Sequence, residues 1–477
     1  MKSTASTFRP GLAASVLLSI AGAASAQTPA SDEISQLREQ IRQLDQKLRV
    51  LERKQELKDE AAASAPKAPT PVAGAGGFGI TSADKKFDLK LRALAQFDGR
   101  FFLDDGAPNR NGFLLRRVRT IFSGTVGGIY DFNITPELGG GTNNSTSVGL
   151  WDAFIAARFN PSFNLRFGKF PSAVGLEPGA NRHFIESPFV NTLLPNRDLG
   201  VEAFGKVGIV DYRLGVVKGT ANNTANFGGA SSDYADGDFT VAGRLSITPF
   251  QNLDGAISKV SVGIGASRGN ERGTADTADT NLSNNGLSNI SSNSQQAIFS
   301  YGSTLFANGT HTRISPSIEW YPGTPFSFAA EYAIEKQDIA VNGAGLTREF
   351  ENSAWRASAA WVLTGEESAK AGVTPKNAFD PAKGTWGAFE LVGRVSGLDL
   401  DSKLFRSVAD GGAGLNRANN ATGAFAYGAG LNWYFNRNFR LLFNVEHTKF
   451  DNAKTPTAQV GAQDDELAFL TRAHLSF

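Results

Sequence analysis

The stretch FLTRAHLSF, residues 469–477, has an apolar or neutral residue at every second position. Between them lie mostly polar residues, including Arg472, His474 and Ser476. A repeat of two is that of a β-strand, whose successive side chains point to opposite faces. One apolar and one polar face suit a membrane-spanning barrel, whose strands lie between lipid and an aqueous lumen. The aromatic Phe477 on the lipid-facing register is what we expect at the end of a bacterial outer-membrane barrel.

The same alternation recurs from about residue 85 onward, between breaks rich in Gly, Asn and Asp. It predicts about 16 strands, near residues 87–102, 112–125, 129–138, 148–159, 163–170, 199–208, 210–218, 238–248, 258–268, 312–321, 325–337, 353–364, 385–400, 424–435, 438–450 and 466–477. An even number of strands fits a barrel with both termini in the periplasm. About 16 strands leave an aqueous channel. We therefore predict an all-β fold, a 16-stranded antiparallel transmembrane β-barrel over residues 85–477.

The links between these segments differ in length. Asn436-Arg437-Asn438 has the size of a tight periplasmic turn, whereas 269–296 and 365–384 have the length of external surface loops. A soluble β-sandwich would also alternate. It would not need aromatic residues near the strand ends, which here are Trp151, Trp320, Tyr321, Trp433, Tyr434 and Phe435.

The N-terminus has the features of a secretory signal peptide over residues 1–26. Lys2 and Arg9 are basic, 11–23 is apolar, and Ala24-Ser25-Ala26 is a small-residue cleavage site. The alternative, a membrane anchor, needs a longer run to cross about 30 Å of hydrocarbon. The absence of Cys fits an envelope protein. We therefore expect the outer membrane of a Gram-negative cell, and membrane lipid as the barrel's surroundings.

Residues 27–62 have a different pattern. Apolar residues spaced alternately by three and four form a heptad seam: Ile34, Leu37, Ile41, Leu44, Leu48 and Leu51. The pattern predicts a periplasmic coiled-coil helix, with a lone surface helix as the alternative. Ile at heptad position a and Leu at position d favour a coiled coil of two helices, although the seam is short. The Ala/Pro/Gly-rich segment 63–84 is expected to be a linker.

The formal net charge of +1 argues against a nucleic-acid partner. Charge is concentrated locally in the strand 112–125, where Arg117 and Arg119 are expected to face the lumen and attract anions. Other strand arginines at plausible inward positions are Arg92, Arg166, Arg244, Arg356, Arg394 and Arg440. The alternative is that these arginines pair with inward carboxylates, namely Asp152, Glu331, Glu390 and Glu446.

The chain resembles the phosphate-selective porin O/P family. The resemblance rests on segments in family order: Phe113–Phe122, Trp151–Phe154, Phe159–Pro161, Leu165–Phe170, Gly175–Glu177, Leu363–Glu366, Gly387–Leu391 and Gly430–Tyr434. It implies a trimer of 16-stranded barrels that pass small anions, and a loop at about 171–198 that folds inward to narrow the channel. Arg116 and Arg117 match the family's lumenal arginine pair, with Arg119, Arg166 and Arg244 as further anion-attracting candidates. The resemblance places Asp152 and Glu177 at the constriction, and Arg182 and His183 of the same loop are further candidates that the resemblance does not require.

Two positions depart from the family pattern. Phosphate-binding members carry Lys and Arg where this chain has Pro178 and Ser187. The expected function is passive diffusion of small anions, phosphate-like oxyanions included, through a moderately anion-selective channel without a tight phosphate site. The alternative is a general or organic-anion porin without phosphate selectivity.

An outer-membrane hydrolase is the rival class. Residues 265–269 fit the G-x-S-x-G pattern, but a nucleophile there requires a strand, a sharp turn and a helix. The four histidines show no metal-ligand spacing, and no phosphate-binding Gly-rich loop is present. We expect no catalytic residues, metal or cofactor.

Overall fold

The computed structural model describes residues 30–64, 68–103, 111–140, 148–176, 183–219, 238–273, 285–302, 304–341, 346–417, 420–451 and 464–477. The chain divides into two compact units, Met1–Lys67 and Ala68–Phe477. The predicted signal peptide lies outside the described residues.

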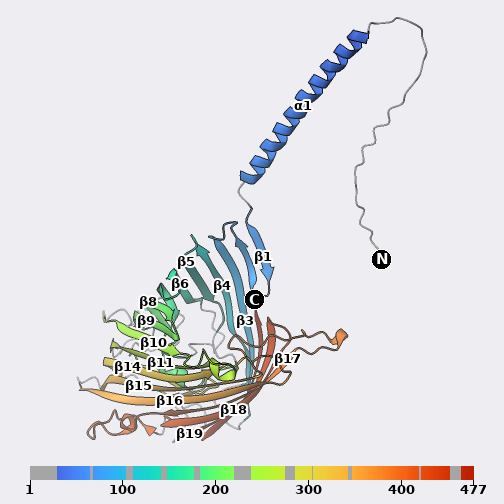
Figure 1. Cartoon of the computed structure of the whole chain (residues 1–477). Helices are drawn as coiled ribbons and strands as arrows, with labels where there is room; N and C mark the ends of the chain where they lie inside the picture. Colours follow the sequence, from blue (N-terminus) through green and yellow to red (C-terminus); the bar gives the residue numbers. More distant parts are fainter. Residues whose placement is uncertain are drawn as a thin grey trace. The chain divides into compact units, whose positions relative to one another are not determined.

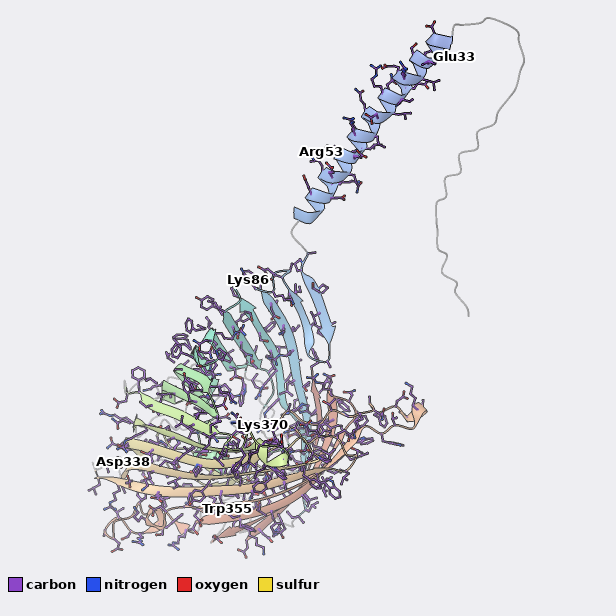
Figure 2. The ribbon with its side chains drawn as sticks, viewed as in Figure 1. Glu33, Arg53, Lys86, Asp338, Trp355 and Lys370 are labelled. Atoms are coloured by element: carbon purple, nitrogen blue, oxygen red, sulfur yellow. The ribbon has the colours of Figure 1, made fainter. Side chains whose placement is uncertain are left out.

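The first unit contains one helix, α1 (Ala30–Ser64), as the heptad pattern predicts. Its seam side chains are between 50 and 64 per cent exposed. Charged side chains cover the other faces, and Glu33 and Arg53 point away from the helix axis in Figure 2. Among the described residues, no helix has a stretch that is long and apolar enough to cross a membrane. The helix therefore presents an apolar stripe that has no partner among the described residues of its own unit.

The second unit is built on an 18-stranded antiparallel sheet, in which strands adjacent in sequence lie side by side (Figure 1). Sixteen of these strands, counted over the described residues, form the barrel wall: β3 (Asp88–Phe102), β4 (Gly112–Val126), β5 (Tyr130–Glu137), β6 (Gly149–Asn160), β7 (Phe163–Pro171), β8 (Arg197–Val207), β9 (Val210–Gly219), β10 (Thr240–Ile247), β11 (Val260–Arg272), β14 (Phe306–Trp320), β15 (Phe326–Val341), β16 (Leu346–Val362), β17 (Ala388–Asp399), β18 (Gly423–Tyr434), β19 (Phe439–Asp451) and β20 (Asp465–Ser476).

The wall is closed. Each strand pairs with the next in antiparallel register, and β20 returns to pair with β3, with Arg472 opposite Asp98. Every one of the predicted strands corresponds to a strand of the structure. The 16-stranded antiparallel barrel is therefore confirmed, and the pairing of β20 with β3 closes the sheet formed by these strands.

A hairpin lies where we expected only a linker. β1 (Thr70–Gly74) pairs with β2 (Gly77–Thr81), and β2 pairs with the start of β3. β20 pairs with β3 only from Leu94 onward. The hairpin pairs with the earlier residues of β3 and so extends the wall beyond the end of β20. Pro71 is tolerated because β1 is an outer strand of this hairpin. Residues 70–81 of the segment that we expected to be a linker, 63–84, therefore contain two strands of the barrel sheet.

The wall has apolar residues outside and polar residues inside. On β18 and β19 the outward side chains Phe425, Tyr427 and Val445 are exposed, whereas the inward Asn432 and Glu446 are buried. This distribution of apolar and polar side chains is the reverse of that in a soluble protein. It is the distribution that lipid outside and a polar lumen inside require.

Strand order corrects the expected position of one link. The short links 127–129, 161–162 and 208–209 lie at the barrel end where the chain enters β3 and leaves β20. The link between β16 and β17, which includes 365–384, lies at that same end by strand parity, not at the opposite end as its length suggested. It is held by aromatic packing: the rings of Phe379 and Phe435 are 4.6 Å apart, and Trp433 donates a hydrogen bond to the carbonyl of Trp386 at 2.7 Å.

Candidate channel lining and constriction

A β-bulge directs all three arginines of β4 into the lumen. Arg117 lies opposite Gln96 and Leu115 lies opposite Phe97, so Arg116 is an extra residue on β4. Strict alternation would have turned Arg116 toward lipid, but an extra residue resets the register and allows two adjacent side chains to face inward. The sequence alone predicted only Arg117 and Arg119 on this face from alternation.

The three arginines have different partners. Arg116 binds the carboxylate of Glu186 through Nε at 2.8 Å and through a terminal nitrogen at 3.1 Å. Arg119 pairs with Glu137 at 2.5 Å. Arg117 donates a hydrogen bond to the amide oxygen of Gln96 at 3.0 Å. Of the three, only Arg117 has no carboxylate of the described residues within ion-pair distance.

The loop between β7 and β8 crosses the lumen. It contains the short helix α2 (Val190–Leu193). Near the start of the loop, the backbone N–H of Leu176 donates to Glu331 on β15 at 2.7 Å. Farther along, Ile185 donates its N–H to Asn444 on β19 at 2.7 Å. Because β15 and β19 belong to different parts of the wall, we conclude that this loop narrows the channel, as the resemblance implied.

Arginines gather around the loop near Glu186. Arg100 on β3 contacts the Glu186 carboxylate at 2.5 Å. Arg394 on β17 donates to the Glu186 carbonyl, and Arg472 on β20 donates to the Ile185 carbonyl, each at 2.7 Å. With Arg116 on β4 and Asn444 on β19, five strands therefore hold this part of the loop.

The loop carboxylate remains ionised in this setting. Burial by itself raises the pKa of Glu186, but the positive charges of Arg116 and Arg100, together with the hydrogen bond from Arg116, outweigh burial. The pKa is held well below its ordinary value of 4.5. Glu186 is thus a fixed negative charge among arginines.

A second loop also folds inward, which the sequence did not indicate. The link from β11 to β14 carries a short hairpin of β12 (Ile290–Ser291) and β13 (Ala297–Phe299). The Ser294 carbonyl accepts a hydrogen bond from Arg100 at 3.0 Å. Side chains of the same hairpin reach Glu466 and Ser396 at 3.1 and 3.2 Å. We expected 269–296 to be an external loop, but its buried Ser and Asn side chains bind the inner wall.

The two loops share an apolar core inside the barrel. Phe189 and Leu193 of the first loop belong to the same buried cluster as Ile298 and Phe299 of the second. All four side chains are at most 2 per cent exposed. A packed core of this kind fixes the loops against each other rather than leaving them free in the lumen.

A second bulge moves Trp151 away from the position we expected. Thr135 pairs with Asp152 and Pro136 with Leu150, so Trp151 is the extra residue on β6. Its ring is 3.7 Å from the guanidinium of Arg119 and 4.3 Å from that of Arg197. Trp151 therefore lies among lumenal cations and is not part of the membrane-interface aromatics.

The remaining candidate residues are dispersed. Arg166 pairs with Glu202 at 2.5 Å. Asp152 pairs with Arg197 at 2.6 Å. His183 lies 3.4 Å from Glu390.

Arg244 behaves like Arg117. It donates to the carbonyl of Val174 on the crossing loop at 3.0 Å and also binds the hydroxyl of Ser317. Among the described residues these two arginines hydrogen-bond only to neutral groups. Glu177 and Arg182 lie outside the described residues.

Several lining residues were not among our candidates, namely Arg100, Glu186, Arg197, Arg213, Arg313 and Arg472. A signal for two of them was available. Arg472 occupies the polar register of residues 469–477, and Arg100 shares the inward register of β3 with Gln96 and Asp98. Extending the alternation argument along β3 and β20 would have found both.

The G-x-S-x-G pattern is not a catalytic turn. Residues 265–269 lie within β11 and pair with β14 throughout. The strand–turn–helix context that a nucleophile needs is absent from this described segment.

A closed 16-stranded barrel with an apolar outer wall and inward loops defines the class of outer-membrane porins. Comparison with known proteins gives the family. Residues 87–477 match the family described as "Phosphate-selective porin O and P", and the chain belongs to it. It is a channel of the Gram-negative outer membrane rather than an enzyme.

The chain is also similar to individual outer-membrane proteins. Porin O of Pseudomonas aeruginosa is 24% identical over 422 residues, which are 84% of this chain and 91% of that protein. Among solved structures, the outer membrane channel DcaP of Acinetobacter baumannii is 12% identical, with a TM-score of 0.51 over 84% of this chain and 100% of that one. A loop-deletion mutant of OmpT of Vibrio cholerae gives a TM-score of 0.50 at 9% identity, over 82% of this chain and 100% of that one. These two structures support the fold alone.

Proposed function

We propose that this porin carries small anions, phosphate-like oxyanions among them, across the outer membrane by passive diffusion. The observation that carries the proposal is the pair Arg117 and Arg244, whose hydrogen-bond partners in the described part of the chain are all neutral. Each arginine lies beside an anchor of the crossing loop, Arg117 next to Arg116 and Arg244 on Val174. Uncompensated charge at a constriction sets ion preference, because its field acts on every ion that passes within about 8–10 Å.

Tight phosphate retention is not expected. Most of the other lumenal arginines are neutralised: Arg116 by Glu186, Arg119 by Glu137 and Arg166 by Glu202. Ser187 supplies no cation on the loop. The second candidate, a general or organic-anion porin, is favoured by this extensive pairing.

The reversal potential of single channels in a salt gradient tests the proposal. We expect moderate anion preference with chloride, and only weak block of the chloride current by submillimolar phosphate. A channel that prefers cations would contradict it. Equal permeation of large organic anions and phosphate would favour the second candidate.

We also propose that the porin is a homotrimer with α1 in the periplasm. Barrel topology supports the placement, because the first and last strands have their free ends on the side of the short turns, which face the periplasm in outer-membrane barrels. The exposed seam of α1 supports self-association, since an apolar stripe of this kind is stable in water when helices pair. Cross-linking of the full chain in outer membranes tests both points.

A further inference from the structure

We infer that Glu186 is the tethered occupant of an oxyanion site formed by Arg100, Arg116 and Arg472. The inference rests on the proposed function and adds a residue that sets the affinity of the channel for oxyanions. In this view the channel has a built-in site for phosphate or carboxylate anions, and its own loop carboxylate fills it.

The contacts around Glu186 are those of a bound oxyanion. One carboxylate oxygen is 2.5 Å from Arg100 and 2.8 Å from Arg116, and the other is 3.1 Å from Arg116. Arg472 is 3.8 Å away. The two contacts from Arg116 are the bidentate geometry with which arginine recognises carboxylate and phosphate.

The site is preformed by the wall rather than by the loop. The three arginines come from β20, β3 and β4, which are consecutive in the closed sheet. Arg472 is fixed by two bonds to Asp98, at 2.6 and 2.7 Å. Arg100 is also held by the Ser294 carbonyl. Two of the three guanidinium groups would therefore keep partners if Glu186 lost its charge.

Removing that charge takes the carboxylate partner from Arg100 and Arg116, whereas Arg472 keeps Asp98. A buried charge that loses its partner is strongly unfavourable. A solute anion of similar size would restore the balance. In the native chain this solute must displace a carboxylate that is tethered, and a tethered group competes at high effective concentration. The native channel therefore binds oxyanions weakly and releases them fast.

The test compares Glu186→Gln with Glu331→Gln in the full chain, with block of the current by inorganic phosphate as the readout. Glu331 is a matched control because it is also a buried carboxylate that anchors the crossing loop, through Leu176, and that pairs with an arginine, Arg356 at 3.3 Å. Both variants change the lumenal charge by one. Only Glu186→Gln removes the anionic group from the three-arginine site.

In Glu186→Gln we expect the phosphate concentration for half block to fall by about tenfold or more, since an uncompensated buried arginine cluster is a strong anion ligand. Glu331→Gln, which takes the carboxylate from one arginine rather than from a cluster, should lower that concentration much less. Glu186→Asp, which keeps the charge with a shorter side chain, should also bind phosphate weakly. This variant tells us whether a change of loop geometry alone alters the phosphate block.

Equal shifts in the two Gln variants would overturn the inference, because net lumenal charge would then explain both. A larger conductance in Glu186→Gln with no gain in phosphate block would also overturn the inference, because Glu186 would then only hold the crossing loop against the wall. The native reversal potential is measured in the same recordings. A native preference for cations would contradict the proposed function. Saturable phosphate block in Glu186→Gln could still be measured on the cation current, so the further inference would be tested separately.

Discussion

Arg100 and Glu186 form a buried ion pair of 2.5 Å between the barrel wall and the loop that crosses the lumen. The other terminal nitrogen of Arg100 donates to the carbonyl of Ser294 on the second inward loop. One side chain on β3 therefore fastens both loops that narrow the channel. Because the loops also share an apolar core, loosening one of them is expected to affect the other.

Arg100→Met should widen the channel. The change removes bonds to a charged and to a neutral acceptor, and a hydrogen bond to a charged group contributes about 1.5–3 kcal/mol. We expect higher single-channel conductance and more current noise, with the barrel still folded because its ladder is intact. Arg158→Met is the control, since Arg158 pairs with Asp131 at a half-exposed position away from the loops. Unchanged conductance in Arg100→Met would show that the apolar core alone holds the loops.

The constriction should resist mild acid. A carboxyl whose pKa is lower in the folded than in the unfolded state stabilises the fold above its unfolded pKa. That contribution is lost as the pH falls through the folded pKa. For Glu186 the folded pKa lies well below 4.5. Conductance should therefore stay constant from pH 7 to about pH 4.5 and rise only at lower pH. A conductance step near pH 4.5 that is present in the native chain and missing in Glu186→Gln would contradict this assignment.

The strands were predictable because lipid and lumen impose a period of two on each of them. The hairpin at 70–81 was not, because Pro71 and the surrounding Ala and Gly residues have the composition of a linker. These residues pair only because β3 extends beyond the end of β20 and offers them a free edge. That edge is a property of the closed barrel and not of the local sequence.

The candidate site was only partly predictable for a similar reason. The bulges at Arg116 and Trp151 reset the side-chain direction, and nothing in the neighbouring residues marks them. The pairing of Arg116 with Glu186 joins residues 70 positions apart. Resemblance placed a crossing loop near 171–198, but which carboxylate meets which arginine depends on the tertiary fold.

Arg117→Gln should reduce anion preference. No carboxylate that the structure describes lies within ion-pair distance of Arg117, so its loss removes an uncompensated positive charge from the constriction. The reversal potential should shift toward cations at low salt. The shift should shrink near 1 M salt, where screening shortens to about 3 Å. Arg158→Gln, at the half-exposed position used above, should leave the reversal potential unchanged. If the two variants behave alike, Arg117 does not set the selectivity.

The seam of α1 gives the last prediction. Leu44 and Leu48 occupy successive seam positions and are 64 and 55 per cent exposed in the single helix. Replacing both with Asp should abolish self-association of a 27–62 peptide, because charge at core positions of a coiled coil is costly. Sedimentation and circular dichroism measure the effect. The exposed pair Gln43→Asp and Lys47→Asp is the control, since both positions lie outside the seam.

In the full chain the Leu44→Asp, Leu48→Asp variant should still form a heat-modifiable barrel. The barrel wall and its loops belong to a separate compact unit, Ala68–Phe477. Loss of trimers from outer membranes in this variant, with monomeric barrels retained, would show that α1 drives assembly. Retained trimers would show that the barrel walls associate by themselves. A native peptide that is monomeric and non-helical at high concentration would show that the heptad seam does not form a coiled coil.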